Sequence, residues 1–300
     1  MSVQVPPHKL TETNNTRRID IFSWSIETIV APIINASESD ELQASLGFPL
    51  PEMTFGNNSL VIRHNPTGWE YQLDATHALK QVRGGELQPG DGGVRVGYAD
   101  AWLKSRLDPD ASSPFPQTSP TKPYDWTYTS MYPGHVTSGE KFNFVPADPE
   151  SPRHAIPIAE LTRQDPILFY AEVPLYEDEL HDNGMSQVTV RVRVMPGAFF
   201  LLARFTLRVD NVLFRTYDTR IYHSFSSSPP LIIRECSGWE ASYDTIKQQL
   251  PRRNDLTPLI DPNFVAKALG SLPEIVAQKT GAGTGWRGMG SEITVCTLPA

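Results

Sequence analysis

Cysteine is nearly absent from this 300-residue chain, which contains only Cys236 and Cys296. Two cysteines this far apart provide neither a disulfide framework nor the paired spacing of a zinc site. We therefore expect both to be free thiols in a reducing compartment.

Dense clusters of basic residues are also missing. Lys and Arg total 26 against 34 Asp and Glu, which gives a formal net charge of −8 and a pI near 5.4. A protein that follows a nucleic-acid backbone needs a basic stripe, because binding to phosphates is largely electrostatic. We therefore expect no nucleic-acid partner.

No apolar run is long enough to cross a membrane. The most apolar segment, 194–205, is interrupted by Pro196 and Arg204 and is shorter than the ~20 residues that a spanning helix needs. The first residues lack a basic stretch followed by an apolar one, so we predict no secretory signal and no membrane partner. These absences favour a soluble protein inside the cell, in the cytoplasm with the nucleus as a second compartment.

What the chain does contain favours an antiparallel sheet. In QVTVRVRVMP, valines alternate with polar residues from Val188 to Val194. A strand turns alternate side chains to opposite faces, so the valines should face a core while Arg191 and Arg193 face solvent or a partner. The apolar segments 198–210 and 212–225 should continue this strand as a meander.

Several segments have the spacing and caps of short helices. Ser37 is expected to cap a helix that Gly47 ends, Asp74 to cap a second, and Asp261 to cap a helix over 261–278. A further helix is predicted over 239–250.

These elements predict an α+β fold with an antiparallel β-sheet core of meander or sandwich type and flanking helices in a single domain. The domain should span residues 19–278, between a flexible N-terminal arm, 1–18, and a flexible Gly-rich tail, 279–300. Within the domain, residues 108–121 are rich in Pro and Ser and predict an exposed loop.

An aromatic strip follows that loop in KPYDWTYTS, residues 122–130. If the segment is a strand, Tyr124, Trp126 and Tyr128 share one face while Asp125 and Thr127 share the other. Each aromatic side chain can bury ~150–250 Å², which favours core support. A carbohydrate or small-ligand module that uses Trp126 remains an alternative.

The acidic segment LYEDELHDNG contains Glu177, Asp178 and His181. A metal-dependent hydrolase built on these side chains is the alternative function. A run of neighbouring side chains fans out, however, whereas a metal site needs converging ligands, so a solvated or partner-facing loop is favoured. Since no nucleophile elbow and no cysteine with a nearby base occur, we expect no enzyme activity and no cofactor.

Several quoted segments and their order carry a family resemblance. LPEMTFGNNSLVIRH, KPYDWTYT and the long block from LYEDELHDNG through RTYDTRIYH closely resemble the Tip-forty-one-like (TIPRL) family, over about Phe48 to His223. Members of that family are non-catalytic regulators in TOR signalling. They bind the catalytic subunit of type 2A serine/threonine phosphatases and, in fungi, also the Tap-type regulatory subunit. The resemblance implies the same partners here.

The resemblance also implies partner contacts at four positions. Thr216 and Asp218 match phosphatase-binding positions in RTYDTR, and Ile156 matches a hydrophobic contact. His77 falls where animal members carry an acidic residue, and Thr216 falls where they carry Met. We further hypothesise that Asp218 forms a charged patch with Arg215 and Arg220.

Overall fold

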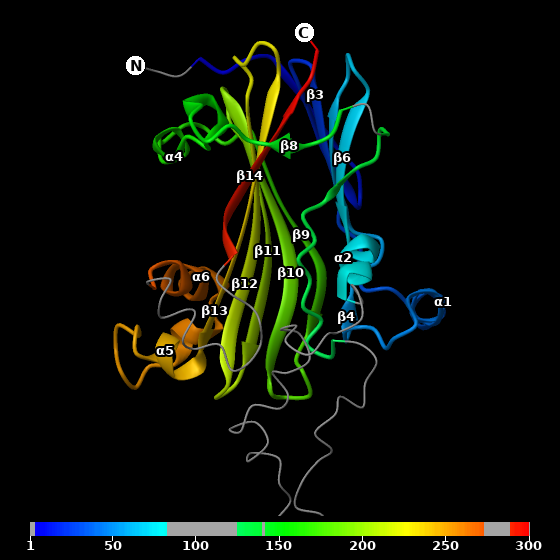
Figure 1. Cartoon of the computed structure of the whole chain (residues 1–300). Coiled ribbons are helices and arrows are strands. Elements are labelled where there is room, and N and C mark those ends of the chain that lie inside the picture. The colour runs from blue at the N-terminus through cyan, green and yellow to red at the C-terminus, as the bar shows by residue number, and fades with distance from the viewer. Residues whose placement is uncertain (1–3, 83–124, 140–141, 273–288, 300) are drawn as a thin grey trace, which may run out of the picture.

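The computed structural model describes residues 4–82, 125–139, 142–272 and 289–299. It consists of two antiparallel sheets that face each other (Figure 1). The predicted α+β class with an antiparallel core is confirmed. The loop predicted at 108–121 lies outside the described residues. Within the described part of the chain, no helix has the length and apolar character needed to cross a bilayer.

The first sheet has six strands and the second has eight. In spatial order the first contains β1 (His8–Glu12), β2 (Thr16–Ile21), β3 (Trp24–Ile29), β5 (Ser59–His64), β6 (Trp69–Asp74) and β7 (His135–Val136). The second contains β4 (Met53–Thr54), β9 (Phe169–Asp178), β10 (Gly184–Val194), β11 (Ala198–Val209), β12 (Leu213–Ser224), β13 (Leu231–Ser242), β14 (Met289–Thr297) and β8 (Val145–Pro146). Strands β10, β11 and β12 form the predicted meander, and β9 and β13 extend it on either side. The acidic segment predicted as a loop begins inside β9, which includes Glu177 and Asp178.

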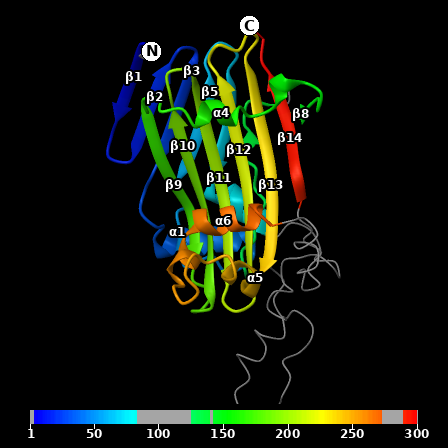
Figure 2. The ribbon, with the colours of Figure 1, turned by 90° about the vertical axis from the view of Figure 1, so that its left-hand side faces the viewer.

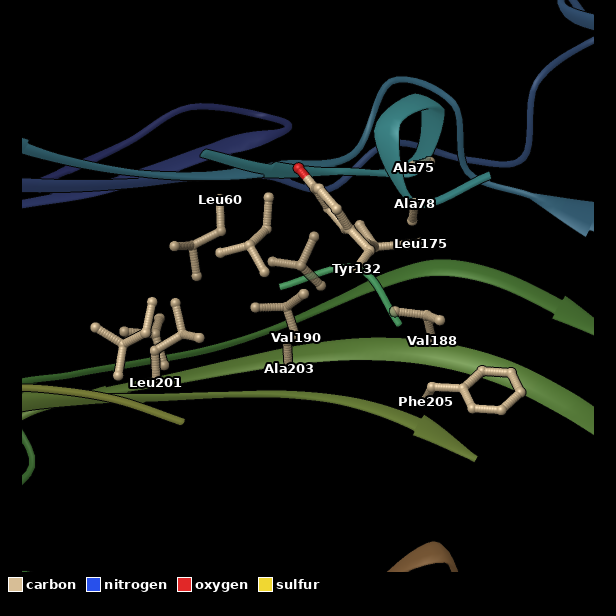
Figure 3. Close-up of a cluster of buried hydrophobic side chains, with 14 of the residues drawn as sticks. Leu60, Ala75, Ala78, Tyr132, Leu175, Val188, Val190, Leu201, Ala203 and Phe205 are labelled. Carbon is tan, nitrogen blue, oxygen red and sulfur yellow. The ribbon is translucent and has the colours of Figure 1, made fainter. Parts of the chain in front are cut away.

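The main core lies between the two sheets. Figure 3 shows Leu60 of β5 facing Leu201 of β11 and Val190 of β10 across this space. Along β10 the burial alternates residue by residue, with Val188 to Val194 inside and the arginines outside, as the sequence predicts. Because β10 has one buried face, a shift of one residue in its register would expose every valine.

Both chain ends differ from the prediction. The arm expected over residues 1–18 forms β1 and begins β2, which pair in register from His8 with Ile21. The expected flexible tail is wrong for Met289–Thr297, because β14 pairs with β13 in the eight-stranded sheet. Neither segment has an alternating apolar pattern that would predict a strand. Both are ordered because their backbone groups hydrogen-bond to a neighbouring strand.

The helices are short and lie outside the sheets. They are α1 (Ala36–Leu46), α2 (Ala75–Val82), α4 (Ile158–Leu161), α5 (Tyr243–Lys247) and α6 (Pro262–Gly270), with 3₁₀ turns η2 (Pro152–His154) and η3 (Thr257–Ile260). Asp261 caps α6 as predicted. Helix α5 is shorter than predicted because β13 continues to Ser242.

The cap of α1 is also corrected. Asn35, not Ser37, accepts the backbone N–H of Glu38, and the Glu38 carboxylate accepts the N–H of Asn35. This reciprocal capping box satisfies two helix-end donors at once, which explains why the helix begins one residue before Ser37. Gly47 ends the helix with a left-handed φ of 78°.

The described part of the aromatic strip, residues 125–130, is not a strand, and Tyr124 lies outside the described residues. Residues 125–130 form a turn and an extended stretch, in which Asp125 and Thr127 are buried rather than exposed. Tyr128 is buried in the main core and Trp126 packs against it, so core support is confirmed for these two. Thr127 donates its backbone N–H and its hydroxyl to the Asp125 carboxylate, which allows these polar side chains to lie inside.

Stability should fall as the pH is lowered from about 6.5 to about 4. His223 is buried against Trp24, with ring centroids 4.4 Å apart, and burial lowers its pKa to about 4. Between pH 6.5 and pH 4, His223 is protonated in the unfolded chain but stays neutral in the folded chain. The free energy of unfolding therefore drops by up to about 3 kcal/mol. Urea unfolding across this range should show a smaller slope in His223→Gln than in His8→Gln, an exposed control. Equal slopes would contradict the assignment.

Candidate partner-binding surface

Helices cover the two ends of the outer face of the eight-stranded sheet and leave its middle open (Figure 2). At one end α5 and α6 pack on Phe214 of β12. At the other end Ile156 packs on Tyr222 and Ile233, and the Tyr222 hydroxyl donates to the carboxylate of Glu160 in α4 over 3.1 Å. The four positions predicted from the family resemblance can now be located relative to these two ends.

In the open middle of this sheet face, the strand register aligns a row of side chains across five strands. Glu172, Arg191, Leu202, Arg220 and Glu235 lie directly opposite one another in β9 to β13. Paired residues share a face, and because Arg191 alternates with buried valines, the row faces outward. The charged residues pair at its two ends, Arg191 with Glu172 at 2.9 Å and Arg220 with Glu235 at 2.9 Å.

The adjacent row contributes the strongest contact. Asp218 of β12 lies opposite Arg204 of β11, and the guanidinium donates to both carboxylate oxygens at 2.7 and 2.8 Å. Arg220 donates to the same carboxylate at 2.9 Å. Together these six charged side chains form the charged band: Glu172, Arg191, Arg204, Asp218, Arg220 and Glu235.

Opposite charges are paired at the edge of the charged band, between Glu172 and Arg191, as well as around Asp218 at its centre. The hydrogen bond from Arg191 lowers the pKa of Glu172, and the same contact raises the pKa of Arg191. Arg204 also donates to Asn263 Oδ1 at 3.1 Å and thereby connects the band to α6. The guanidinium groups are therefore held in fixed positions on the sheet.

Three of the four predicted partner-binding residues lie on this outer face. Asp218 is 4 % exposed, Thr216 is 2 % exposed between Thr206 and Trp239, and Ile156 is 7 % exposed. Such buried side chains position their neighbours and offer little area for direct contact. Patterning alone did not connect Arg204 to Asp218, since this connection depends on the cross-strand register.

The hypothesis that Arg215 belongs to the same patch is wrong. Arg215 and Asp218 are separated by three positions on one strand, so they face opposite sides. Arg215 points between the sheets, is fully buried, and donates to Glu240 at 2.6 and 2.8 Å.

His77 is separate from the other three residues. It lies on α2, which Figure 1 places on the side of the molecule away from α5 and α6. Its Nδ1 lies 2.8 Å from an Asp74 carboxylate oxygen, and its ring lies 4.0 Å from that of His135, between centroids. Asp74 also accepts the backbone N–H of His77, which confirms it as the cap of α2.

The acidic segment does not gather metal ligands. Asp178 is buried and accepts the backbone N–H groups of Glu52 and Leu180 at 3.0 and 2.7 Å, so its carboxylate fixes a turn. Burial, with Glu179 nearby, raises the pKa of Glu177. Across the described part of the chain, the one group of three side chains close enough to hold a metal is Asp74, His77 and His135.

The fold and surface define the class: a two-sheet antiparallel sandwich with an ordered charged band on one outer face. Comparison with known proteins then gives the family. The sequence profile of the TIP41-like family matches residues 53–247, and the chain belongs to that family, as the resemblance in its sequence predicted.

Three relatives are similar over most of the chain. The Type 2A phosphatase activator TIP41 of Saccharomyces cerevisiae is 36 % identical over 281 residues, which cover 89 % of this chain and 76 % of the relative. The Type 2A phosphatase activator tip41 of Schizosaccharomyces pombe is 35 % identical, with 80 % and 88 % covered. The TIP41-like protein of Homo sapiens is 34 % identical, with 85 % and 86 % covered.

Proposed function

We propose that this protein is a non-catalytic regulator that binds the catalytic subunit of type 2A-family serine/threonine phosphatases in TOR signalling, with a Tap-type regulatory subunit as a second partner. The observation that carries the proposal is the 36 % identity, over 89 % of the chain, to a protein named as a type 2A phosphatase activator.

The charged band supports a protein partner. Arginine is enriched where proteins bind one another, and fixed charges of both signs select a partner with the complementary pattern. Half-buried Leu202 lies in the centre of the row and offers an apolar contact between Arg191 and Arg220. We assign the direct contacts to Arg191, Leu202 and Arg220, while Asp218 holds Arg220 in place from below the surface. Thr216 and Ile156 are buried on the same face and support the surface by packing.

Arg220→Ala should weaken capture of a purified type 2A catalytic subunit about tenfold, as loss of an interface arginine costs roughly 1–2 kcal/mol. The side chain is 29 % exposed, so its removal leaves the sheet packed. Biolayer interferometry with the immobilised phosphatase measures the change.

Arg63→Ala is the matched control, because Arg63 forms an exposed pair with Glu70 on the other sheet. It should bind like the native protein. If the native protein does not bind the phosphatase, the function is wrong. If Arg63→Ala loses as much affinity as Arg220→Ala, the function stands but the surface is wrong.

A further inference from the structure

Three metal-ligating side chains converge at the edge of the six-stranded sheet, away from the charged band. Asp74 ends β6, His77 lies in the first turn of α2, and His135 lies in β7. One donor atom from each lies within 4.8 Å of the other two. Metal–ligand distances of about 2.0–2.2 Å place tetrahedral donors roughly 3.3–3.6 Å apart, so small side-chain rotations close the site.

The backbone fixes two of these positions. His135 pairs with Gln72 in the neighbouring strand, and Asp74 is two residues further along β6, so the side chains of His135 and Asp74 project from the same face of the sheet. His77 is held over them because the Asp74 carboxylate accepts both its backbone N–H and its Nδ1–H. This group differs from the acidic segment around Asp178 because its ligands lie on helices and strands that hold them in place.

The hydrogen bonds also fix the tautomer of His135 that can bind a metal through Nε2. The Tyr132 hydroxyl contacts His135 Nδ1 at 2.7 Å and the Gln72 carbonyl oxygen at 3.2 Å. The carbonyl can only accept, so the hydroxyl donates to it and accepts a hydrogen bond from His135 Nδ1–H. Nε2 of His135 is then left with its lone pair, and Tyr132 supplies the outer contact that metal-binding histidines commonly have.

We propose that Asp74, His77 and His135 bind one divalent transition-metal ion, with Zn²⁺ as the best match. In the bound form the metal takes the place of the hydrogen bond between Asp74 and His77 Nδ1, whose proton moves to Nε2 of the same ring, and Nε2 of His135 is the third ligand. Two imidazoles and one carboxylate suit zinc and disfavour Mg²⁺ and Ca²⁺, which prefer oxygen ligands. The His77 side chain is 43 % exposed, so the remaining coordination position opens to solvent.

The test is calorimetric titration of the untagged full-length protein with ZnCl₂ at pH 7.5. We expect one equivalent of Zn²⁺ to bind, no binding of Mg²⁺, and loss of Zn²⁺ binding in His135→Ala and in His77→Ala. His8→Ala, an exposed histidine in β1, should bind like the native protein. Tyr132→Phe should weaken binding by about 10–100-fold, since it removes only the outer contact.

A second measurement does not depend on any variant. Native protein with one equivalent of Co²⁺ should develop the intense visible absorption of a tetrahedral site, and added Zn²⁺ should remove it. Absence of this spectrum, absence of Zn²⁺ binding by the native protein, or unchanged affinity in both histidine variants would overturn the site. No phosphatase is present in either measurement, so the result is independent of the proposed function.

Discussion

Glu240→Ala should lower the free energy of unfolding by about 3–5 kcal/mol. Glu240 is 3 % exposed and Arg215 is fully buried, and the guanidinium donates two hydrogen bonds to one carboxylate oxygen, at 2.6 and 2.8 Å. Removing the carboxylate takes away the acceptor of two hydrogen bonds from a fully buried positive charge. Urea unfolding followed by tryptophan fluorescence measures the loss.

The control for this prediction is Glu70→Ala. Glu70 is 21 % exposed and pairs with the 49 % exposed Arg63 on the outer side of the six-stranded sheet, where water screens an ion pair so that it contributes about 0–1 kcal/mol. The two variants remove the same residue type from the same kind of pair and differ in burial. If both lose the same stability, the interior pair is not the reason for the effect.

Asp218→Ala should have the largest effect on the charged band, on two measurements at once. The carboxylate is the shared acceptor of Arg204 and Arg220, so its loss should cost about 3 kcal/mol of stability. Arg204 then keeps only its contacts to α6, and Arg220 keeps Glu235. Because both arginines are held less firmly, the affinity for a type 2A catalytic subunit should fall by more than the tenfold expected for Arg220→Ala.

Asp218→Asn separates the two effects. Asparagine keeps one acceptor oxygen and the same volume, so it should retain more stability and more affinity than alanine, while circular dichroism remains native. If Asp218→Ala binds the phosphatase as tightly as the native protein, the band does not form the contact surface.

The alternating strands were predictable because burial on one face leaves a period of two in the sequence. The valines of β10 show this pattern, and the structure confirms it. The same argument failed for residues 125–130, because Trp126 and Tyr128 lie in a turn and an extended stretch in which Asp125 and Thr127 hydrogen-bond each other and are buried. A period of two over a short segment therefore does not by itself identify a strand.

The candidate sites were predictable only in part. The family positions in RTYDTR identified Asp218 and its neighbour Arg220, but the second arginine partner, Arg204, comes from β11, which nothing in the local sequence indicates. Likewise, Asp74 and His77 are neighbours in the chain, whereas His135 joins them because β7 pairs with β6. Both sites depend on which strands are adjacent.

The sequence by itself determined the antiparallel class, the meander from β10 to β12 and the family, because burial period, turn residues and long similar segments are local properties of the chain. The tertiary structure alone decided that β1 and β14 are ordered, that Arg215 faces the core, and that Arg204 holds Asp218. Those outcomes depend on cross-strand register, which joins residues distant in sequence through backbone hydrogen bonds.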